Sequence, residues 1–186
     1  IRDRLIAEPL ERGFGLTLGN SIRRILLSSL QGAAITSVKI KGVVHEFSTI
    51  PGVKEDLTDI LLNLKSIAVK VHSPGLKKMY LKSSGSGELR AGNFETDSET
   101  EIMNPDQLIM TLDSNADVEI EANVETGKGY VSAEVAEDEN KVIGEIKLDA
   151  MFSPVVKATY KVENSRVGQV TDFDKLILEV ETNGAI

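Results

Sequence analysis

Few side chains in this sequence are spaced so that they could do chemistry together, and the clearest pair is acidic. Asp172 and Asp174 alternate in the run TDFD. Alternate residues of an extended segment point to the same side, so the two carboxylates could share a Mg²⁺ ion. No third carboxylate follows at a fixed spacing. We therefore predict that both carboxylates face water at the start of a strand and that the chain holds no metal.

The other reactive residues lack partners in the sequence. Lys128 stands between Gly127 and Gly129, but the spacing GxxxxGK[ST] of a phosphate-binding loop is absent, so we predict a hairpin turn. His45 and His72 have no neighbouring motif and are predicted to be partly buried in strands. The absence of cysteine excludes disulfides, thiolate metal sites and a cysteine nucleophile. We predict no catalytic residue and no cofactor.

The composition of the 186 residues is that of a soluble globular protein, with 41% hydrophobic and 27% charged residues. Asp and Glu number 29 against 21 Lys and Arg, which gives a formal net charge of −8. Such a chain is repelled by phosphate backbones and has no Lys/Arg-rich run, so we expect no direct contact with nucleic acid. It has no run of about 18 apolar residues and no signal-peptide pattern, so we predict a cytoplasmic protein that does not bind membranes.

The element that must position most of the candidate residues is an amphipathic helix predicted over residues 11–30. At about 100° per residue, one stripe of this helix holds Phe14, Leu18, Ile22, Ile25, Leu26 and Ser29. This spacing predicts that the stripe packs on the chain's own sheet. Gly15 and Gly19 lie one turn apart on a third edge, where the lack of side chains favours the close approach of another backbone, and we predict a close helix crossing there.

The opposite side of the same helix mixes apolar and basic residues, namely Leu16, Asn20, Arg23, Arg24 and Leu27. Arginine supplies a planar charged fork and is enriched at the energetic centres of interfaces, while leucine supplies area. This mixture suits docking to another protein. Ordinary surface helices also carry arginines and scattered leucines, so periodicity alone leaves both interpretations open.

The rest of the sequence predicts an α+β fold. Gln31-Gly32 is expected to close the first helix, and a period of two over 34–47 predicts a strand pair or a bent strand. Apolar residues at helical spacing predict a second helix over 53–65. The remaining predictions are a hairpin over 67–81, a flexible connection over 83–93, a loop over Glu134–Asn140, and strands over 107–112, 117–124, 142–148, 155–162 and 175–181.

The run ERGFGLTLGNSIRRILLSSL, residues 11–30, resembles the signature segment of the bacterial-type DNA-directed RNA polymerase alpha subunit, amino-terminal domain. The later blocks VVHEFSTIPGVKED, DILLNLK, GKGYV, FSPV, TDFDKL and ETNG resemble the same family and occur in its order. The resemblance therefore covers residues 8–186 and does not depend on a short degenerate motif.

This resemblance implies a scaffold subunit of the transcribing enzyme, a nucleotidyltransferase, with no active site of its own. In the family, two copies form a homodimer that gathers the large catalytic subunits β and β′. One copy mainly touches β and the other mainly touches β′, and the polymerisation chemistry lies on those partners. The resemblance also implies two domains. Residues 1–31 and 154–186 would form a helix-plus-sheet dimerisation domain, with a strand-rich domain, residues 32–153, inserted in it.

The resemblance also assigns contact residues. The positions that match β-subunit contacts are Arg24, Leu27 and Lys175. The positions that match the dimer interface are Phe14 and Ile25, which qualifies the prediction that their whole stripe belongs to the chain's own core. The positions that match β′-subunit contacts are Lys65, Leu148 and Val155.

The sequence departs from the family pattern at Leu16, where many members have histidine. It also stops before the carboxy-terminal helix that follows ETNG in the family, and before the linker and the DNA-binding domain. We therefore expect weaker dimerisation and no promoter or activator contact from this segment. Two other classes stay open as alternatives: a metal-dependent enzyme built on Asp172 and Asp174, and a ligand-binding module in the strand-rich middle.

Overall fold

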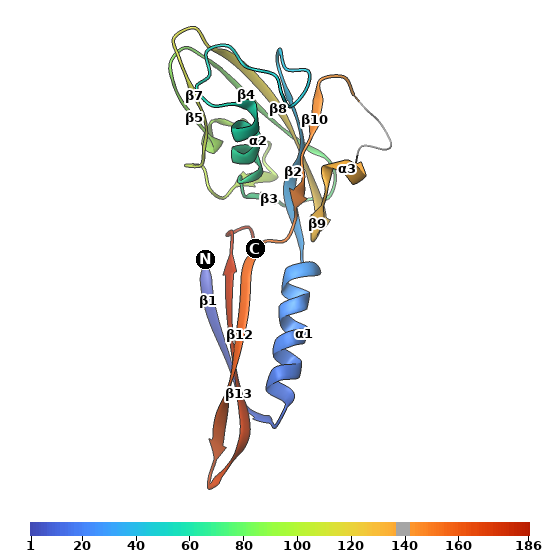
Figure 1. The fold of residues 1–186 in the computed structure, drawn as a ribbon, viewed down its shortest axis with the longest axis vertical. Coiled ribbons are helices and arrows are strands. Elements are labelled where there is room, and N and C mark those ends of the chain that lie inside the picture. Colours follow the sequence, from blue (N-terminus) through green and yellow to red (C-terminus); the bar gives the residue numbers. More distant parts are fainter. Residues whose placement is uncertain (137–141) are drawn as a thin grey trace.

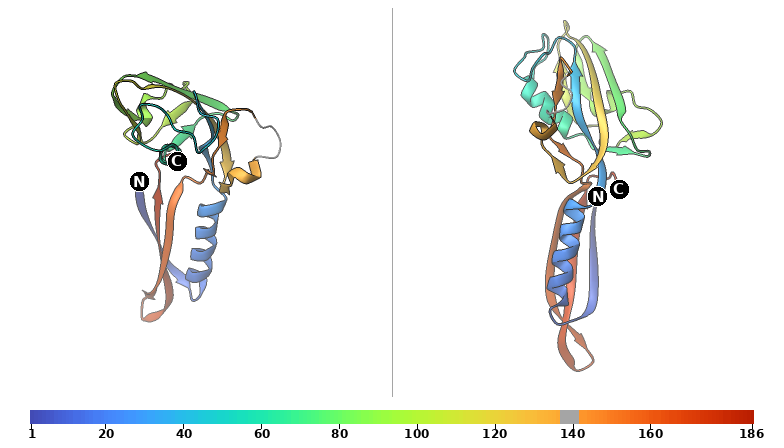
Figure 2. Two further views of the ribbon diagram at one scale, coloured as in Figure 1. Left: turned by 45° about the horizontal axis from the view of Figure 1, so that its top comes forward. Right: turned by 90° about the vertical axis from the view of Figure 1, so that its right-hand side faces the viewer.

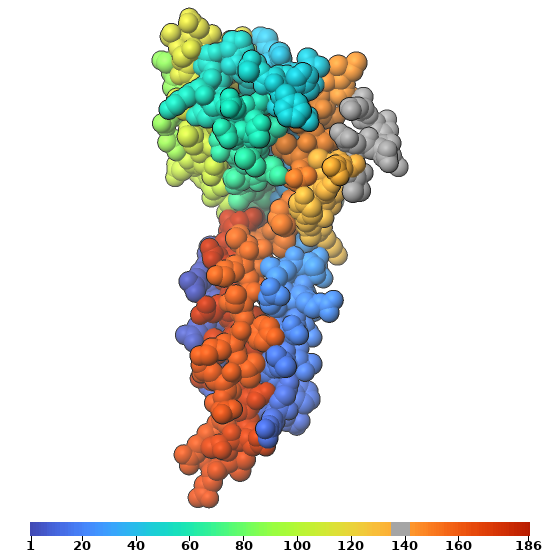
Figure 3. Space-filling model, viewed as in Figure 1, coloured from blue at the N-terminus to red at the C-terminus, as the bar shows by residue number. Residues whose placement is uncertain are grey.

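A computed structural model describes residues 1–136 and 142–186 of the chain. Figure 1 shows an elongated molecule, in which a long twisted sheet and helix α1 form one half and a strand-rich body forms the other. Both chain termini lie where the two halves meet. The space-filling view narrows at the same place (Figure 3).

The elements in chain order are β1 (Arg2–Glu11), α1 (Phe14–Ser28), β2 (Gln31–Ile40), α2 (Leu57–Lys65), β3 (Val69–Val71), β4 (Lys77–Ser84), β5 (Gly87–Arg90), the 3₁₀ helix η1 (Ala91–Asn93), β6 (Thr100–Ile102), β7 (Leu108–Leu112), β8 (Asp117–Lys128), β9 (Tyr130–Val131), α3 (Ala133–Ala136), β10 (Glu145–Lys147), β11 (Ala150–Met151), β12 (Val155–Val167) and β13 (Val170–Thr182).

The long sheet has the strand order β1-β13-β12, and both pairings are antiparallel. Leu178 of the central strand lies opposite Leu5 of β1 and Tyr160 of β12, so apolar residues line up across one face. β12 and β13 are joined by a tight turn at Gly168, whose φ of 61° is a left-handed conformation that suits glycine. This pairing brings the two ends of the chain into one sheet.

Helix α1 packs on this sheet along its glycine edge, which consists of Gly15 and Gly19, the buried residues of the helix. A Cβ atom at Gly15 would lie 2.8 Å from Cγ1 of Val162, and one at Gly19 would lie 2.5 Å from the ring of Tyr160. The close approach predicted at the two glycines is present, but the neighbours are side chains of the chain's own sheet, so the prediction of a close helix crossing is wrong. Figure 2 shows the helix running along one face of that sheet.

The prediction that the stripe of α1 packs on the chain's own sheet is wrong for three of its apolar residues, Phe14, Leu18 and Ile25. It is also wrong for Ser29, which is exposed. Phe14 is 51% exposed, Leu18 36% and Ile25 54%. The reason is geometric, because successive helix residues are about 100° apart. Turning the glycine edge towards the sheet turns these three side chains to the flank of the helix, where the described chain does not cover them.

The strand-rich body is built on a sheet with the strand order β4-β8-β2-β3-β6, and β10 also pairs with β2. The smaller pairings β5-β7 and β9-β11 lie beside it. Helix α2 begins four residues later than predicted, and it buries Leu57, Ile60, Leu61 and Leu64, which confirms this part of its predicted apolar face. The largest fully buried side chains of this body are Ile40, Ile60, Leu64, Met79, Leu81, Ile109, Met110 and Ile120.

Several local predictions for this body are wrong because strand pairing depends on distant segments. β3 and β4 do not form a hairpin, since β3 pairs with β2 and β6 while β4 pairs with β8. The strand predicted over 34–47 ends at Ile40, and residues 83–93 hold β5 and η1 instead of a flexible connection. The loop predicted over Glu134–Asn140 begins within α3, and its residues 137–140 lie outside the described part of the chain.

Gly32, which was expected to close α1, is instead a residue of strand β2. A Cβ atom there would collide with the carbonyl oxygen of Phe152. The glycine therefore lets β2 pass the returning chain just before β12 begins. The helix ends at Ser28, and the backbone N–H of the next residue, Ser29, donates to the carbonyl of Ile25.

Glu55 ties the segment before α2 to β7. The backbone N–H of Thr111 donates to Oε2 of Glu55 at 2.7 Å, and the Thr111 hydroxyl donates to Oε1 at 2.8 Å. Partial burial by itself would raise the pKa of Glu55, but the two bonds from Thr111 together outweigh it. The pKa of this carboxyl is therefore held below its ordinary value.

Replacing Glu55 with glutamine is expected to lower the free energy of unfolding by about 1 kcal/mol near neutral pH, because a charge-assisted hydrogen bond becomes neutral. A carboxyl with a lowered folded-state pKa stabilises the fold fully above its unfolded-state pKa, and this contribution is lost as the pH falls through the folded-state value. Urea unfolding at about pH 7 and about pH 3 measures the effect, which is expected to shrink at the lower pH. Glu46→Gln, at an exposed position of the preceding segment, is the matched control. A loss for Glu55→Gln that persists undiminished at the lower pH would contradict the assignment.

Candidate interaction surfaces

The first candidate surface is the apolar edge of α1, formed by Phe14, Leu18 and Ile25. All three side chains lie on one flank of the helix and are at least one-third exposed. Exposed apolar residues that cluster in this way, instead of being scattered, are typical of protein contact sites. The structure thus places the predicted dimer residues Phe14 and Ile25 together on an uncovered flank, and it adds Leu18 between them.

The two arginines of α1 have different environments. Nε of Arg23 donates a hydrogen bond to the carbonyl of Ala158 at 3.0 Å, so Arg23 helps to hold α1 on its own sheet. Arg24 is exposed and makes no ion pair within the described residues. Leu27, one turn from Arg23 on the helix, is half-buried. Arg24 is therefore the arginine that α1 presents outwards.

Lys175, which was grouped with Arg24 and Leu27, lies on the other face of the β1-β13-β12 sheet. Val162 and Asp174 approach α1, so the next residue of β13 points away from the helix. There Nζ of Lys175 pairs with Oε1 of Glu8 at 3.2 Å. The fold brings Arg24 and Leu27 onto one helix, but within a single chain it does not bring Lys175 beside them.

A groove of about 540 Å³ forms the second candidate surface, and we call it the α2 groove. Its lining includes Phe47, Leu62, Lys65, Glu145, Lys147 and Leu148. Phe47 is 81% exposed and Leu62 53%, so its rim is apolar. Two of the predicted β′-contact residues, Lys65 and Leu148, meet in this groove. The third, Val155, begins β12 and is buried, and it is not part of the lining.

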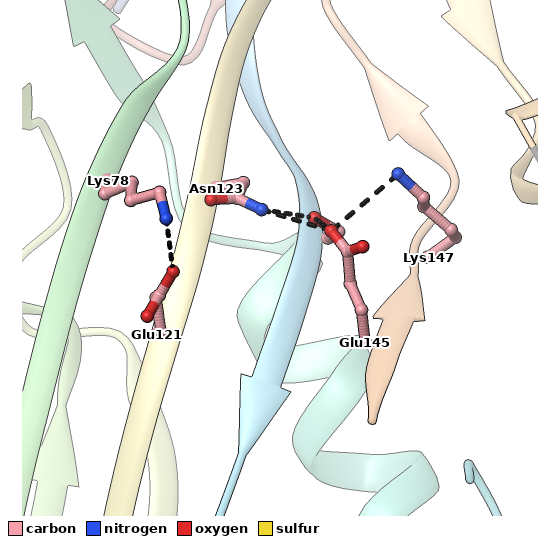
Figure 4. A network of polar contacts seen from close by, with 6 residues as sticks. Lys78, Glu121, Asn123, Glu145 and Lys147 are labelled. Carbon is pink, nitrogen blue, oxygen red and sulfur yellow. Dashed lines mark hydrogen bonds and ion pairs between the residues drawn. The ribbon is translucent and has the colours of Figure 1, made fainter. Parts of the chain in front are cut away.

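A polar network crosses β8, β2 and β10 beside the α2 groove (Figure 4). Nδ2 of Asn123 donates to Oγ of Ser37 at 2.8 Å and to Oε1 of Glu145 at 3.1 Å, and the Ser37 hydroxyl donates to the same Oε1 at 2.5 Å. Nζ of Lys147 lies 3.7 Å from that oxygen. Ser37 is buried, and a buried polar group requires such partners. The network therefore fixes β10, one wall of the groove, against β2.

The two aspartates considered for Mg²⁺ have structural partners in this fold. Oδ2 of Asp174 accepts the backbone N–H groups of Gly13 and Gly15, at 2.9 and 3.1 Å, at the start of α1. A carboxylate in this position satisfies free N–H groups and complements the helix dipole. Oδ1 of Asp172 pairs with Arg12 at 3.2 Å. Among residues 1–136 and 142–186, no group of three or more His, Cys, Asp and Glu side chains is arranged to hold a metal.

The histidines and the glycine-flanked lysine have simple environments. His45 and His72 are exposed and lie outside the strands, so the prediction that they are partly buried in strands is wrong. Nε2 of His72 lies 3.7 Å from Oε2 of Glu101. Gly127 and Lys128 continue β8, and the turn occurs at Gly129, where φ is 64°. The predicted turn is therefore shorter than expected, because Gly127 is needed where the ring of Phe152 crosses β8.

Sequence reasoning missed Asp149, which bonds both Lys65 and the start of α3 beside the α2 groove. Its partners lie 84 and 16 residues away along the chain, and no local motif marks it. Leu18 could have been recognised as an exposed residue, because it falls on the same helix flank as Phe14 and Ile25.

The fold and its surfaces define a strand-rich protein with exposed apolar and charged patches of the kind that contact other proteins. The family model described as the RNA polymerase Rpb3/RpoA insert domain matches residues 38–153, which is more than half of the chain. The chain therefore belongs to this family and is an RNA polymerase alpha/Rpb3-type subunit, part of a nucleotidyltransferase complex that carries out transcription. The match begins within β2 and ends just before β12, so it covers the strand-rich body. Within the described residues, no helix is long and apolar enough to cross a membrane.

Proposed function

We propose that this chain is the amino-terminal part of a bacterial-type alpha subunit and acts as a cytoplasmic, non-catalytic scaffold. Two copies dimerise, and the dimer gathers the β and β′ subunits, which carry the polymerisation chemistry. The family match supports membership of the polymerase, and the uncovered surfaces on α1 and α2 support a role in contacting other subunits. With a net charge of −8, the segment is expected to contact proteins instead of nucleic acid.

The proposal includes a division into two domains. Residues 1–31 and 154–186 form the dimerisation domain, and residues 32–153 form the inserted domain. β1, α1, β12 and β13 supply the long sheet and its helix from both ends of the chain, which supports this division. The chain passes into the strand-rich body after α1 and returns at Ser153-Pro154, close to the end of the family match.

The contact residues are assigned to three partners. We assign Phe14 and Ile25 to the dimer interface. The β-subunit contacts are Arg24, Leu27 and Lys175, and the β′-subunit contacts are Lys65, Leu148 and Val155. The exposure of Arg24 is the observation that carries the proposal, since this arginine has no ion-pair partner among the described residues. Arginines of this kind are over-represented among the residues that dominate binding energy.

Replacing Arg24 with alanine is therefore expected to weaken binding to the β subunit at least about 30-fold, which corresponds to the loss of a contact worth about 2 kcal/mol. The chain is mixed with a purified bacterial β subunit, and the mass of the complex is measured by light scattering after gel filtration. The unchanged chain is expected to form a two-to-one complex that Arg24→Ala does not form at the same concentrations.

The matched control for this experiment is Arg90→Ala. Arg90 is also exposed, but it lies in β5 and pairs with Glu88 at 2.6 Å, away from α1. Its replacement is expected to leave the complex intact. Failure of the unchanged chain to bind β, or an equal loss for both alanine variants, would contradict the proposed scaffold role of α1.

A further inference from the structure

Asp149 joins three segments that are distant in sequence. It lies between β10 and β11, and its Oδ2 accepts a hydrogen bond from Nζ of Lys65, at the end of α2, at 3.0 Å. Its Oδ1 accepts the backbone N–H of Ala133, the first residue of α3, at 3.0 Å. Both carboxylate oxygens therefore have defined partners beside the α2 groove.

The Lys65–Asp149 pair is more shielded from water than a typical surface ion pair of this chain. The side chains of Lys65 and Asp149 are 32% and 36% exposed, whereas those of the Lys41–Asp117 pair are 60% and 57% exposed. Fully exposed ion pairs contribute little free energy, because water screens the charges and both side chains must be ordered. The Ala133 N–H and then Lys65 hold the pKa of Asp149 below its ordinary value, so the carboxyl is charged near neutral pH.

The shielded pair determines where the lysine head group lies. A lysine side chain has a flexible stem and substantial rotamer entropy, which a partner would otherwise have to remove on binding. Lys65 offers three N–H donors, and the bond to Asp149 uses one of them. The remaining donors can face oxygen acceptors of a bound protein across the α2 groove, which Leu148 also lines.

We propose that Asp149 is a positioning residue of the β′-contact surface, which orders Lys65 so that it presents two N–H donors to carboxylate or carbonyl oxygens of the partner. The same carboxylate holds the start of α3 in place. This inference rests on the proposed function, since it requires that Lys65 contacts the β′ subunit. Asp149 acts through Lys65 and does not itself touch the partner.

A double-mutant cycle on the full chain tests this inference, with affinity for a purified bacterial β′ subunit as the readout. Asp149→Asn and Lys65→Ala are each expected to weaken binding about tenfold, and the double variant is expected to bind no more weakly than Lys65→Ala alone. A purely structural role of Asp149 would weaken binding in the Lys65→Ala background as well. Additive losses, about 100-fold for the double variant, would therefore overturn the inference.

Two further variants keep the test independent of folding. Asp149→Glu retains the charge and is expected to bind within about threefold of the unchanged chain. Asp117→Asn breaks the exposed pair with Lys41, and it is expected to leave the affinity for β′ unchanged. Thermal melting of each variant, followed by circular dichroism, checks that the chain is folded.

The outcomes separate the inference from the proposed function. If the unchanged chain does not bind β′, the proposed function fails. If the unchanged chain binds and Lys65→Ala weakens binding while Asp149→Asn does not, only the positioning role is overturned. The inference also fails if Lys65→Ala has no effect, because Asp149 would then have no contact residue through which to act.

Discussion

Replacing Gly19 with valine is expected to lower the free energy of unfolding of the α1 half by about 3 kcal/mol, the upper end of the usual cost of overpacking. A Cβ atom there would lie 2.5 Å from the Tyr160 ring, and the two methyl groups of valine add to this clash. Valine is a slightly better helix former than glycine, by less than about 1 kcal/mol, so the steric cost is expected to dominate. Helix α1 would have to move off the sheet.

Urea unfolding followed by circular dichroism measures this loss, and hydrogen exchange of the α1 amides locates it. The matched control is Asn20→Val, which introduces the same side chain one residue along at an exposed position. It is expected to change the free energy of unfolding by no more than about 0.5 kcal/mol. Equal effects of the two substitutions would show that α1 does not approach the sheet along its glycine edge.

The second large effect is expected from placing charge on the apolar edge of α1. If Phe14 and Ile25 become buried in a homodimer, changing both to aspartate removes about 1.5–3 kcal/mol of apolar burial for each and leaves two charges to be desolvated. The dimer dissociation constant is expected to rise at least about 100-fold, since each tenfold corresponds to about 1.4 kcal/mol. Sedimentation equilibrium over a range of protein concentrations measures the change.

The double variant is expected to remain folded, because Phe14 and Ile25 are about half exposed in the single chain. Leu16→Asp is the matched control, since Leu16 is 58% exposed on the same helix but points away from the apolar edge. It is expected to leave the dimer intact. Dissociation by Leu16→Asp to the same extent, or an unchanged dimer in the double variant, would contradict the assignment of this edge to the dimer interface.

Local sequence signals predicted the elements whose formation depends mainly on neighbouring residues. The apolar spacing of α1 and α2 predicted both helices, and Leu57, Ile60 and Leu64 are buried as that spacing requires. Alternation predicted the strands that became β2, β8, β12 and β13, although their ends differ by several residues. The blocks that resemble the polymerase family, and their order, indicated that family, and the match over residues 38–153 supports this at the level of an alpha/Rpb3-type subunit.

Strand partners and contact surfaces were not available from local sequence. β4 pairs with β8 and not with β3, because the free energy of a sheet depends on side-chain packing between segments that are far apart in the chain. Asp149 gains its role from Lys65 and Ala133, which no spacing rule connects to it. Lys175 was grouped with Arg24 of α1, yet the alternation of β13 places Lys175 on the face of the sheet that points away from α1.

Helix α1 shows most clearly what the sequence determines and what the tertiary structure determines. Its sequence by itself determined that a helix forms, that Gly15 and Gly19 permit a close approach, and that apolar residues occupy more than one flank. Only the tertiary structure decided which flank the chain covers, because Val162 and Tyr160 of β12 supply the surface that fits against the two glycines. Once that contact forms, the rigid helix turns Phe14, Leu18 and Ile25 outwards.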